Sequence, residues 1–208
     1  MYTPAAFKID DREQAIDFMR RHSFATVSTC LQGQLLATHT PMVPFEDESG
    51  ALSLFGHFAK ANPQTASLDN GCEMLIVFSG PHGYISPRWY RQTPAVPTWN
   101  YAAVHARGIA RRITDSGQLT RHLLAMIKAN DPELYSERDV ITPDNKIDQM
   151  LRGISGFSLR VDSLEMKMKL SQNRPLDDRH SVIEALDRSS TCEQRALARM
   201  MEQQAAST

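Results

Sequence analysis

The sequence is poor in cysteine and has no long hydrophobic run. Its 208 residues include three cysteines, far apart at Cys30, Cys72 and Cys192. An odd number without a C-x-x-C pair argues against a disulfide framework or a cysteine-bound zinc site. No run approaches the roughly 18–20 apolar residues of a membrane-spanning helix. The N-terminus also lacks the basic and then apolar pattern of a signal peptide. We therefore expect a soluble, cytoplasmic protein with reduced thiols.

An excess of either charge is also missing. Lys and Arg number 23, Asp and Glu number 24, and the net charge is −1. A protein with a dedicated nucleic-acid surface usually shows a marked excess of Lys and Arg. Such a surface is not expected here, although a local basic patch is compatible with this balance.

The short motifs that identify several enzyme classes are absent. The sequence contains no G-x-G-x-x-G, no G-x-x-x-x-G-K-[ST], no H-E-x-x-H and no G-x-S-x-G. A Rossmann dehydrogenase, a P-loop enzyme, a zincin and a serine hydrolase are therefore not indicated. His39, His57, His82 and His105 lack a diagnostic metal-ligand spacing, so no metal site is predicted.

What is present is a series of strand-like runs separated by turn residues. The runs cover residues 24–30, 35–43, 51–58, 74–79, 84–86, 104–113 and 154–161, the sixth of them interrupted at Gly108. Helical patterns cover 10–21, 117–129, 147–152 and 178–204, with capping boxes at Asp10/Glu13 and Thr191/Gln194. Because regular β–α–β alternation is missing, we predict a mainly β fold, a small barrel with peripheral helices.

The domain organisation follows from this pattern. We predict one barrel domain at residues 1–175, which includes the N-terminal helix and a helical insertion near 117–152. Residues 176–208 form a helical tail packed on the same domain, and residues 130–145 within the insertion form a polar loop. The length and the hydrophobic content of 41% suffice for one sizeable core.

A polar cluster follows the strand at 51–58 and is the first candidate binding segment. It includes Lys60 and Asn62 in the turn after Gly56, preceded along the chain by Thr38 and His39. Free backbone N–H groups, a lysine and an amide suit an anion such as phosphate. An ordinary polar connection between strands is the alternative.

Two further segments concentrate aromatic and polar residues. Both tryptophans and three of the five tyrosines fall between Tyr84 and Tyr101, a composition suited to a flat ring system. The alternative is an aromatic cluster that seals a barrel end or a dimer interface. The segment from Lys169 to Arg174 supplies several hydrogen-bond donors and acceptors, and its alternative is a solvated loop.

Several blocks, in their order along the chain, carry a specific resemblance. They are Ala37-Thr38-His39, Gly56-His57-Phe58-Ala59, Asn62-Pro63-Gln64, Val96-Pro97-Thr98-Trp99-Asn100-Tyr101 and Lys169-Leu170-Ser171-Gln172-Asn173-Arg174. Over nearly the whole chain this succession resembles the PaiB family, bacterial proteins described as FMN-binding negative transcriptional regulators.

The resemblance implies an FMN-binding split barrel of Greek-key type, akin to pyridoxine-phosphate oxidases and flavin reductases. It also implies a domain-interleaved homodimer with FMN between the subunits. The cofactor residues carried over by position are Thr38, His39, Thr40, His57, Phe58, Lys60, Asn62, Trp99, Asn100, His105, Lys169, Gln172 and Asn173. Thr38, His39 and Thr40 would lie along the edge of the isoalloxazine. The residues at 57–62 would contact the ribityl phosphate, and Lys169, Gln172 and Asn173 would close the pocket. The oxidases carry Ser-Arg-Lys in the phosphate turn, whereas Lys60 is the only cation in this one.

Three active roles stay open at this stage, beside a pure binding or storage role, which the sequence does not exclude. The resemblance implies a transcriptional regulator that contacts DNA directly or through a protein partner. A flavin oxidoreductase, in which FMN supplies the hydride or electron chemistry, is the alternative. A haem-degrading activity is a third option, and it would need a histidine ligand such as His39, His57, His82, His105 or His180.

Overall fold

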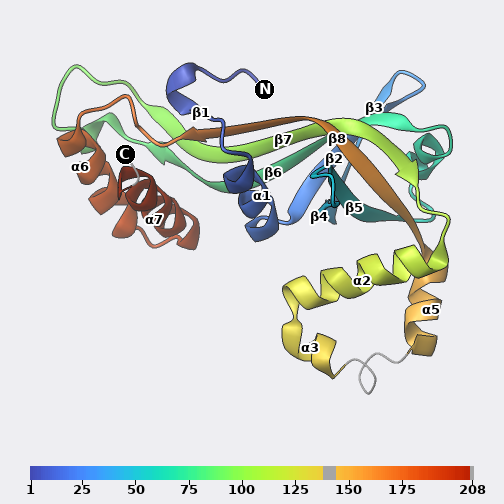
Figure 1. Ribbon diagram of the computed structural model, residues 1–208. Helices are drawn as coiled ribbons and strands as arrows, with labels where there is room; N and C mark the ends of the chain where they lie inside the picture. Colours follow the sequence, from blue (N-terminus) through green and yellow to red (C-terminus); the bar gives the residue numbers. More distant parts are fainter. Residues whose placement is uncertain (138–143, 207–208) are drawn as a thin grey trace. The chain divides into compact units, whose positions relative to one another are not determined.

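The computed structural model describes residues 1–137 and 144–206, and its main element within them is an antiparallel sheet (Figure 1). The strands are β1 (Lys8–Ile9), β2 (Phe24–Leu31), β3 (Gln34–Pro41), β4 (Val43–Glu46), β5 (Leu52–Ala59), β6 (Cys72–Ile85), β7 (Thr98–Arg112) and β8 (Ile154–Lys169). Their order in the sheet is β3-β2-β6-β7-β8-β5-β4, and β1 pairs with β8. The predicted mainly β class with peripheral helices is confirmed.

Helices flank the sheet in the parts of the chain that the structure describes. They are α1 (Arg12–Arg21), α2 (Ser116–Asn130), α3 (Pro132–Ser136), α5 (Asp144–Gly153), α6 (Leu176–Asp187) and α7 (Cys192–Ala206), with 3-10 turns η1 (Ala5–Phe7), η2 (Pro63–Leu68) and η3 (Pro87–Trp89). Among the described residues, no helix is long and apolar enough to span a membrane.

The chain forms two compact units, each assembled from separate stretches of sequence. Unit 1 contains Met1–Ala15, Ser79–Val104 and the chain from Glu165 onward. Unit 2 contains Ile16–Phe78 and His105–Leu164. The three long strands β6, β7 and β8 therefore contribute residues to both units.

The long strands are the main difference from the sequence prediction. The runs predicted at 74–79 and 84–86 belong to one strand, β6, and β7 passes through Gly108 without a break. β8 continues to Lys169, past the predicted end at residue 161. Each of these strands has a hydrogen-bonded neighbour on both sides. That pairing outweighs the local turn preference of Gly80-Pro81-His82-Gly83, because strand propensity depends strongly on context.

Three smaller predictions concerned two helix caps and the loop at 130–145. Asp11, not Asp10, caps α1, since its Oδ1 accepts a hydrogen bond from the backbone N of Gln14 at 3.1 Å. Thr191 caps α7 as predicted, because its hydroxyl accepts from the N of Gln194 at 3.4 Å. The predicted loop at 130–145 contains the short helix α3, and its residues 138–143 lie outside the described chain.

In unit 2 the sheet curls toward closure. Thr40 of β3 donates its hydroxyl to the carbonyl oxygen of His57 in β5 at 2.9 Å, although these strands are not neighbours in the sheet order. Inside, Phe58 stacks on Phe157 with ring centroids 4.7 Å apart, and both side chains are almost fully buried. This closure is what a small barrel requires.

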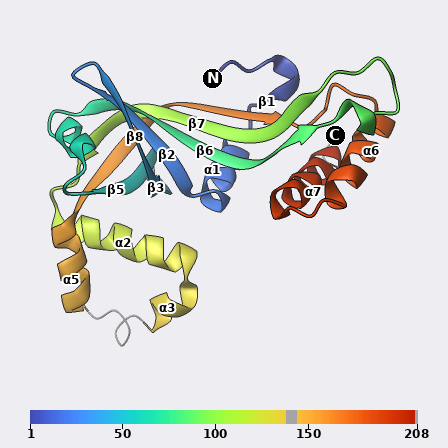
Figure 2. The ribbon, with the colours of Figure 1, turned by 180° about the vertical axis from the view of Figure 1, so that it is seen from behind.

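In unit 1, α6 and α7 lie side by side, as both ribbon views show (Figures 1 and 2). Their shared face buries Val182, Leu186, Leu197 and Met201. Gly83 of β6 also meets this face, because a Cβ at that position would come within 3.1 Å of Leu197.

Gly108 allows β7 and β8 to approach closely in unit 2. A Cβ at this position would overlap the backbone carbonyl oxygen of Arg160, which cannot turn away as a side chain does. We predict that Gly108→Ala lowers the free energy of unfolding by about 3 kcal/mol, at the upper end for overpacking. Urea unfolding of the purified protein measures this change.

Gly153→Ala is the matched control. A Cβ there would meet no atom within 4 Å, so the free energy of unfolding should change by less than about 1 kcal/mol. Equal stability of the two variants would contradict the close strand approach at Gly108.

His122 of α2 contacts the sheet through its ring. It stacks on Phe55 of β5, with centroids 3.6 Å apart and an interplanar angle of 19°. Its Nε2 is buried without a hydrogen-bond partner among the described residues. Burial, and then the charge of Arg121, lowers the pKa of His122 from its ordinary 6.5.

This depressed pKa predicts acid destabilisation. Below about pH 6.5 the unfolded chain binds the proton more readily than the folded one, so the free energy of unfolding falls with pH. His122→Phe keeps a stacked ring and removes the titrating group, so its stability should fall less steeply. Urea unfolding between about pH 7.5 and pH 5 tests this. Parallel curves for the two proteins would show that His122 does not titrate differently on folding.

Candidate functional site

The turn that carries Lys60 is held by its own backbone. Lys60 N–H donates to the carbonyl of Gly153 at 2.9 Å, and Asn62 N–H donates to that of Ala59 at 2.9 Å. The next amides, of Gln64 and Thr65, donate to the side chain and the carbonyl of Asn62. These N–H groups are therefore not free for an anion, contrary to the expectation from the sequence.

A polar network beneath the turn fixes its position. Asn62 Nδ2 donates to the hydroxyl of Thr38 in β3 at 2.7 Å, and Thr38 in turn bonds Gln64. Gln64 is 1% exposed and donates to the hydroxyl of Thr29 at 3.1 Å. Thr38 and Asn62, both predicted to touch the cofactor, thus join β3 to the turn.

Beside this turn, unit 2 has a cavity of about 290 Å³ that gathers three cations. Its lining residues come from the turn, the end of β7, the start of α2, the end of α5 and the start of β8. They are Lys60, Arg112, Ile113, Thr114, Asp115, Ser116, Leu119, Leu151, Arg152, Ile154, Ser155 and Gly156. We call this cavity the Lys60 groove. Lys60 and Arg152 are exposed and form no ion pair with described residues.

Arg112 is the fixed cation of the groove. Its Nε donates to Asp69 at 2.7 Å, one Nη to the hydroxyl of Ser155 at 2.7 Å, and the other to the carbonyl of Thr65 at 2.8 Å. A guanidinium has five N–H donors. Three are used inside the protein, and the other two have no partner among the described residues.

The N-terminus of α2 also borders the groove. Asp115 caps this helix by accepting from the N of Gln118, and Ser116 is its first residue. Partial positive charge at a helix N-terminus adds to the attraction for anions, while the Asp115 carboxylate offsets part of it. Leu119 covers Gly156, where a Cβ would overlap its side chain.

The other unit 2 residues predicted to bind the cofactor lie on β3, β5 and β7. His39 is exposed and stacks near Phe24, with ring centroids 6.1 Å apart. Phe58 is a core residue, 1% exposed, and Thr40 is buried. His57 lies opposite Gly156 in the β5–β8 pairing, and His105 is half-buried in β7.

His57 has an orphaned ring nitrogen. Its Nδ1 is buried without a hydrogen-bond partner among the described residues. Burial lowers the pKa of His57 from its ordinary 6.5. Burial thus favours the neutral ring, which offers one donor and one acceptor.

Unit 1 contains a second cavity, of about 190 Å³, around the segment after β8. It is lined by Phe7, Tyr90, Val96, Thr98, Asn100, Lys169, Ser171, Asn173 and Arg174. We call it the Tyr90 cavity. The structure therefore brings three predicted cofactor residues together here, Asn100, Lys169 and Asn173.

Two other predicted residues of unit 1 stand apart from this lining. Gln172 folds back on its own segment, with Nε2 donating to the carbonyl of Met168 at 2.6 Å and Oε1 accepting from the N of Leu170. Trp99 is 54% exposed and lies near His82 and Tyr84, with ring centroids 6.3 and 6.2 Å away.

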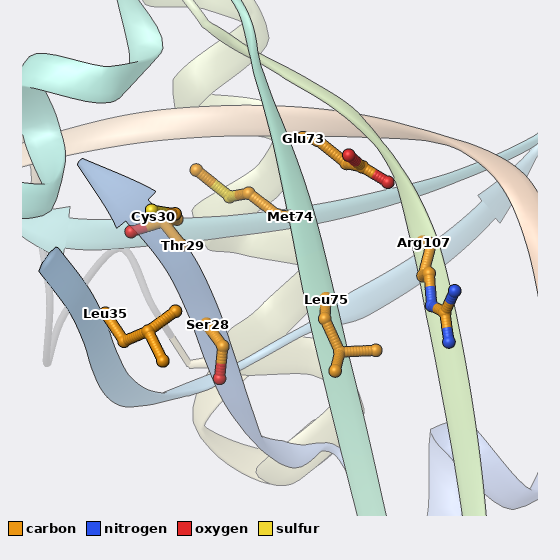
Figure 3. A pocket seen from close by; sticks show the side chains of 8 residues that line it. All are labelled: Ser28, Thr29, Cys30, Leu35, Glu73, Met74, Leu75 and Arg107. Carbon is orange, nitrogen blue, oxygen red and sulfur yellow. The ribbon is translucent and has the colours of Figure 1, made fainter. Parts of the chain in front are cut away.

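A third cavity, of about 280 Å³, lies on β2, β3, β6 and β7 in unit 2 (Figure 3). Figure 3 shows Cys30 and Leu35 at one side and Arg107 on β7 at the other. None of the residues predicted to bind the cofactor lines it. Among the described residues, no group of three or more His, Cys, Asp or Glu side chains is placed to hold a metal.

Sequence reasoning missed three basic residues of these cavities. Arg112 and Arg152 line the Lys60 groove, and Arg174 lines the Tyr90 cavity. Arg174 is the last residue of a segment that the sequence analysis had singled out, and Arg112 is the last residue but one of the strand predicted at 104–113. Position near the end of a segment or strand was therefore the available signal. Their roles depend on partners distant in sequence, which a local pattern does not show.

Comparison with known proteins gives the family. Residues 1–163 match the family model described as "Putative FMN-binding domain". The chain is 36% identical over 207 residues to the Protease synthase and sporulation protein PAI 2 of Bacillus subtilis, covering 97% of both chains.

Solved structures agree with this at the level of the fold. The FAD and haem binding protein of Mycobacterium smegmatis superposes with a TM-score of 0.64 at 16% identity, over 84% of this chain and 78% of that one. The flavocytochrome Anf3 of Azotobacter vinelandii gives 0.63 at 17% identity, over 84% and 74%. The predicted split-barrel fold is confirmed, whereas the interleaved homodimer stays a prediction. The chain belongs to the FMN-binding family that includes the Bacillus PaiB protein, and its cofactor is a flavin.

Proposed function

We propose that this protein binds FMN with the phosphate in the Lys60 groove and acts as a homodimeric regulator of the PaiB type. The observation that carries the proposal is the convergence of Lys60, Arg112 and Arg152 on one cavity whose single carboxylate, Asp115, is engaged as a helix cap. Charge-assisted hydrogen bonds from such cations are the strongest that proteins offer a phosphate.

The residues of the groove fit the phosphate end of FMN. Two N–H donors of Arg112, the ammonium of Lys60 and the hydroxyl of Ser116 supply donors from different elements. The buried Nδ1 of His57, on the strand beside Gly156, is a polar atom without a partner among the described residues. When bound, the flavin supplies hydride or electron chemistry, and this chain holds its phosphate.

The size of the groove supports a shared site. Pockets that bury most of a drug-sized ligand enclose about 300–1,000 Å³, and the groove, at about 290 Å³, is at the lower limit of this range and encloses only part of FMN. The isoalloxazine then needs cover from another surface. A second copy of the chain supplies that cover, and exposed Trp99 with Tyr84 is an aromatic surface suited to such an interface.

The regulatory role rests on the family. The Bacillus relative is named for protease synthesis and sporulation. With a net charge of −1, this chain lacks the basic excess of a dedicated DNA-binding surface. We propose that it regulates through a protein partner, with the flavin as the bound signal.

Lys60→Ala tests the phosphate site. Loss of one charge-assisted contact should cost about 1.5–3 kcal/mol, which lowers FMN affinity roughly tenfold to a hundredfold. Riboflavin, which lacks the phosphate, should bind both proteins equally. Quenching of flavin fluorescence on titration measures both affinities.

Two further variants, one inside the groove and one outside it, test whether the loss of FMN affinity is specific to the groove. Arg152→Gln should weaken FMN in the same selective way, because Arg152 lines the groove. Lys146→Ala removes an exposed cation of the same helix outside the groove and should leave FMN affinity unchanged. Unchanged FMN binding in both groove variants would place the phosphate elsewhere.

Trp99→Ala tests the shared interface. Removing a half-exposed indole from a dimer contact should raise the dimer dissociation constant at least about tenfold, and FMN affinity should fall with it. Analytical ultracentrifugation and flavin titration give the two quantities. A loss of one property without the other would contradict a cofactor pocket shared between subunits.

A further inference from the structure

The Tyr90 cavity of unit 1 has the charge of an anion site. Lys169 and Arg174 both line it, and no acidic side chain does. Neither cation forms an ion pair with any described residue. Two unneutralised cations on a small cavity create a positive potential that a bound anion relieves.

Arg174 is held in place by an aromatic ring. Its Cζ lies 4.3 Å from the ring centroid of Tyr90, a buried residue that also lines the cavity. No described residue accepts a hydrogen bond from the guanidinium N–H groups of Arg174, so they are available to a carboxylate as a planar fork.

Lys169 is oriented by Thr98, which accepts a hydrogen bond from its ammonium group. Burial lowers the pKa of Lys169, Tyr101 opposes this effect, and nearby Lys167 adds to it. An anion in the cavity would favour the charged form of Lys169.

The wall between the two cations is rigid. Ser171 has a φ of 65°, a left-handed conformation that residues other than glycine seldom adopt, and such backbone is concentrated at binding sites. Its hydroxyl bonds Asn100, which is fully buried and donates to it at 2.9 Å. The N–H of Arg174 donates to the Ser171 carbonyl at 2.9 Å, which closes the turn.

Three large side chains in the lining give the cavity an apolar part and limit the size of the ligand. Phe7, Tyr90 and Val96 line the cavity of about 190 Å³. An apolar cavity of roughly 150 Å³ accommodates benzene. The space therefore suits one ring, or an aliphatic group of that size, together with a carboxylate. It is too small for the three fused rings of a flavin.

We propose that the Tyr90 cavity binds a small organic carboxylate, held by Arg174 and Lys169, with its apolar body between Phe7 and Val96. Its lining shares no residue with the Lys60 groove. The proposal requires only that FMN does not occupy this cavity, and it stands even if the FMN phosphate binds outside the Lys60 groove. It reassigns Asn100, Lys169 and Asn173, which the family resemblance had placed around the flavin.

Benzoate is the probe, titrated by calorimetry into the full-length protein with and without saturating FMN. We expect one benzoate per chain in both forms. Arg174→Gln and Lys169→Met should each weaken benzoate at least about tenfold, the effect of losing one charge-assisted contact. Arg88→Gln, which removes an exposed cation of unit 1 outside the lining, should have no effect.

FMN affinity separates this proposal from the flavin site. Arg174→Gln should bind FMN as tightly as the unmodified chain. A selective loss of FMN affinity in this variant, or competition between benzoate and FMN, would assign the cavity to the flavin and overturn the proposal.

Three other outcomes also overturn it: no benzoate binding, benzoate binding by both cation variants as tight as by the unmodified chain, or tighter binding of inorganic phosphate than of benzoate. Circular dichroism checks that each variant folds. If Arg174→Gln does not fold, the benzoate affinities of Lys169→Met and of the charge-retaining Arg174→Lys test the proposal instead. The lysine lacks the planar fork, so it should weaken benzoate less than glutamine does.

Discussion

The contact set of Arg112 is the interaction on which the candidate phosphate site depends. One guanidinium ties Asp69 and Thr65, near η2, to Ser155 at the start of β8. The Lys60 turn is supported just before this strand, because the carbonyl of Gly153, the last residue of α5, accepts a hydrogen bond from the Lys60 amide. A side chain fixed in this way loses little entropy when it meets a ligand. Lys60 and Arg152, both exposed, contribute charge without that fixed geometry.

Each of the two compact units contains part of the set of residues that the sequence analysis predicted to bind the cofactor. In unit 2 the buried amide of Gln64 and the hydroxyls of Thr29 and Thr38 form a satisfied network under the turn. Such a network favours one turn conformation, because each partner left unpaired would cost a desolvation penalty. In unit 1 the corresponding element is the pair of Asn100 and Ser171. Both cavities thus combine a rigid polar support with several cations, of which only Arg112 has an acidic partner, Asp69, among the described residues.

Much of the fold was predictable from sequence, and the site was predictable in part. Runs of β-branched, aromatic and other apolar residues bounded by turn residues located β2 and β5 nearly to their ends. The long strands were not predictable, since neighbours on both sides override the turn signal at Gly80. Lys60 and Lys169 were identified from local polar clusters. Arg112 was not, because its partners Asp69 and Ser155 lie 43 residues away on either side.

The missing side chain at Gly156 has a consequence for sequence variation. Leu119 occupies the space that a Cβ at 156 would need, so this leucine brings α2 onto the strand that forms one wall of the groove. A larger residue at 156 would require a smaller one at 119 or a different path for the helical insertion. The two positions therefore constrain each other through volume, and they should change together among related chains that keep the insertion in this place.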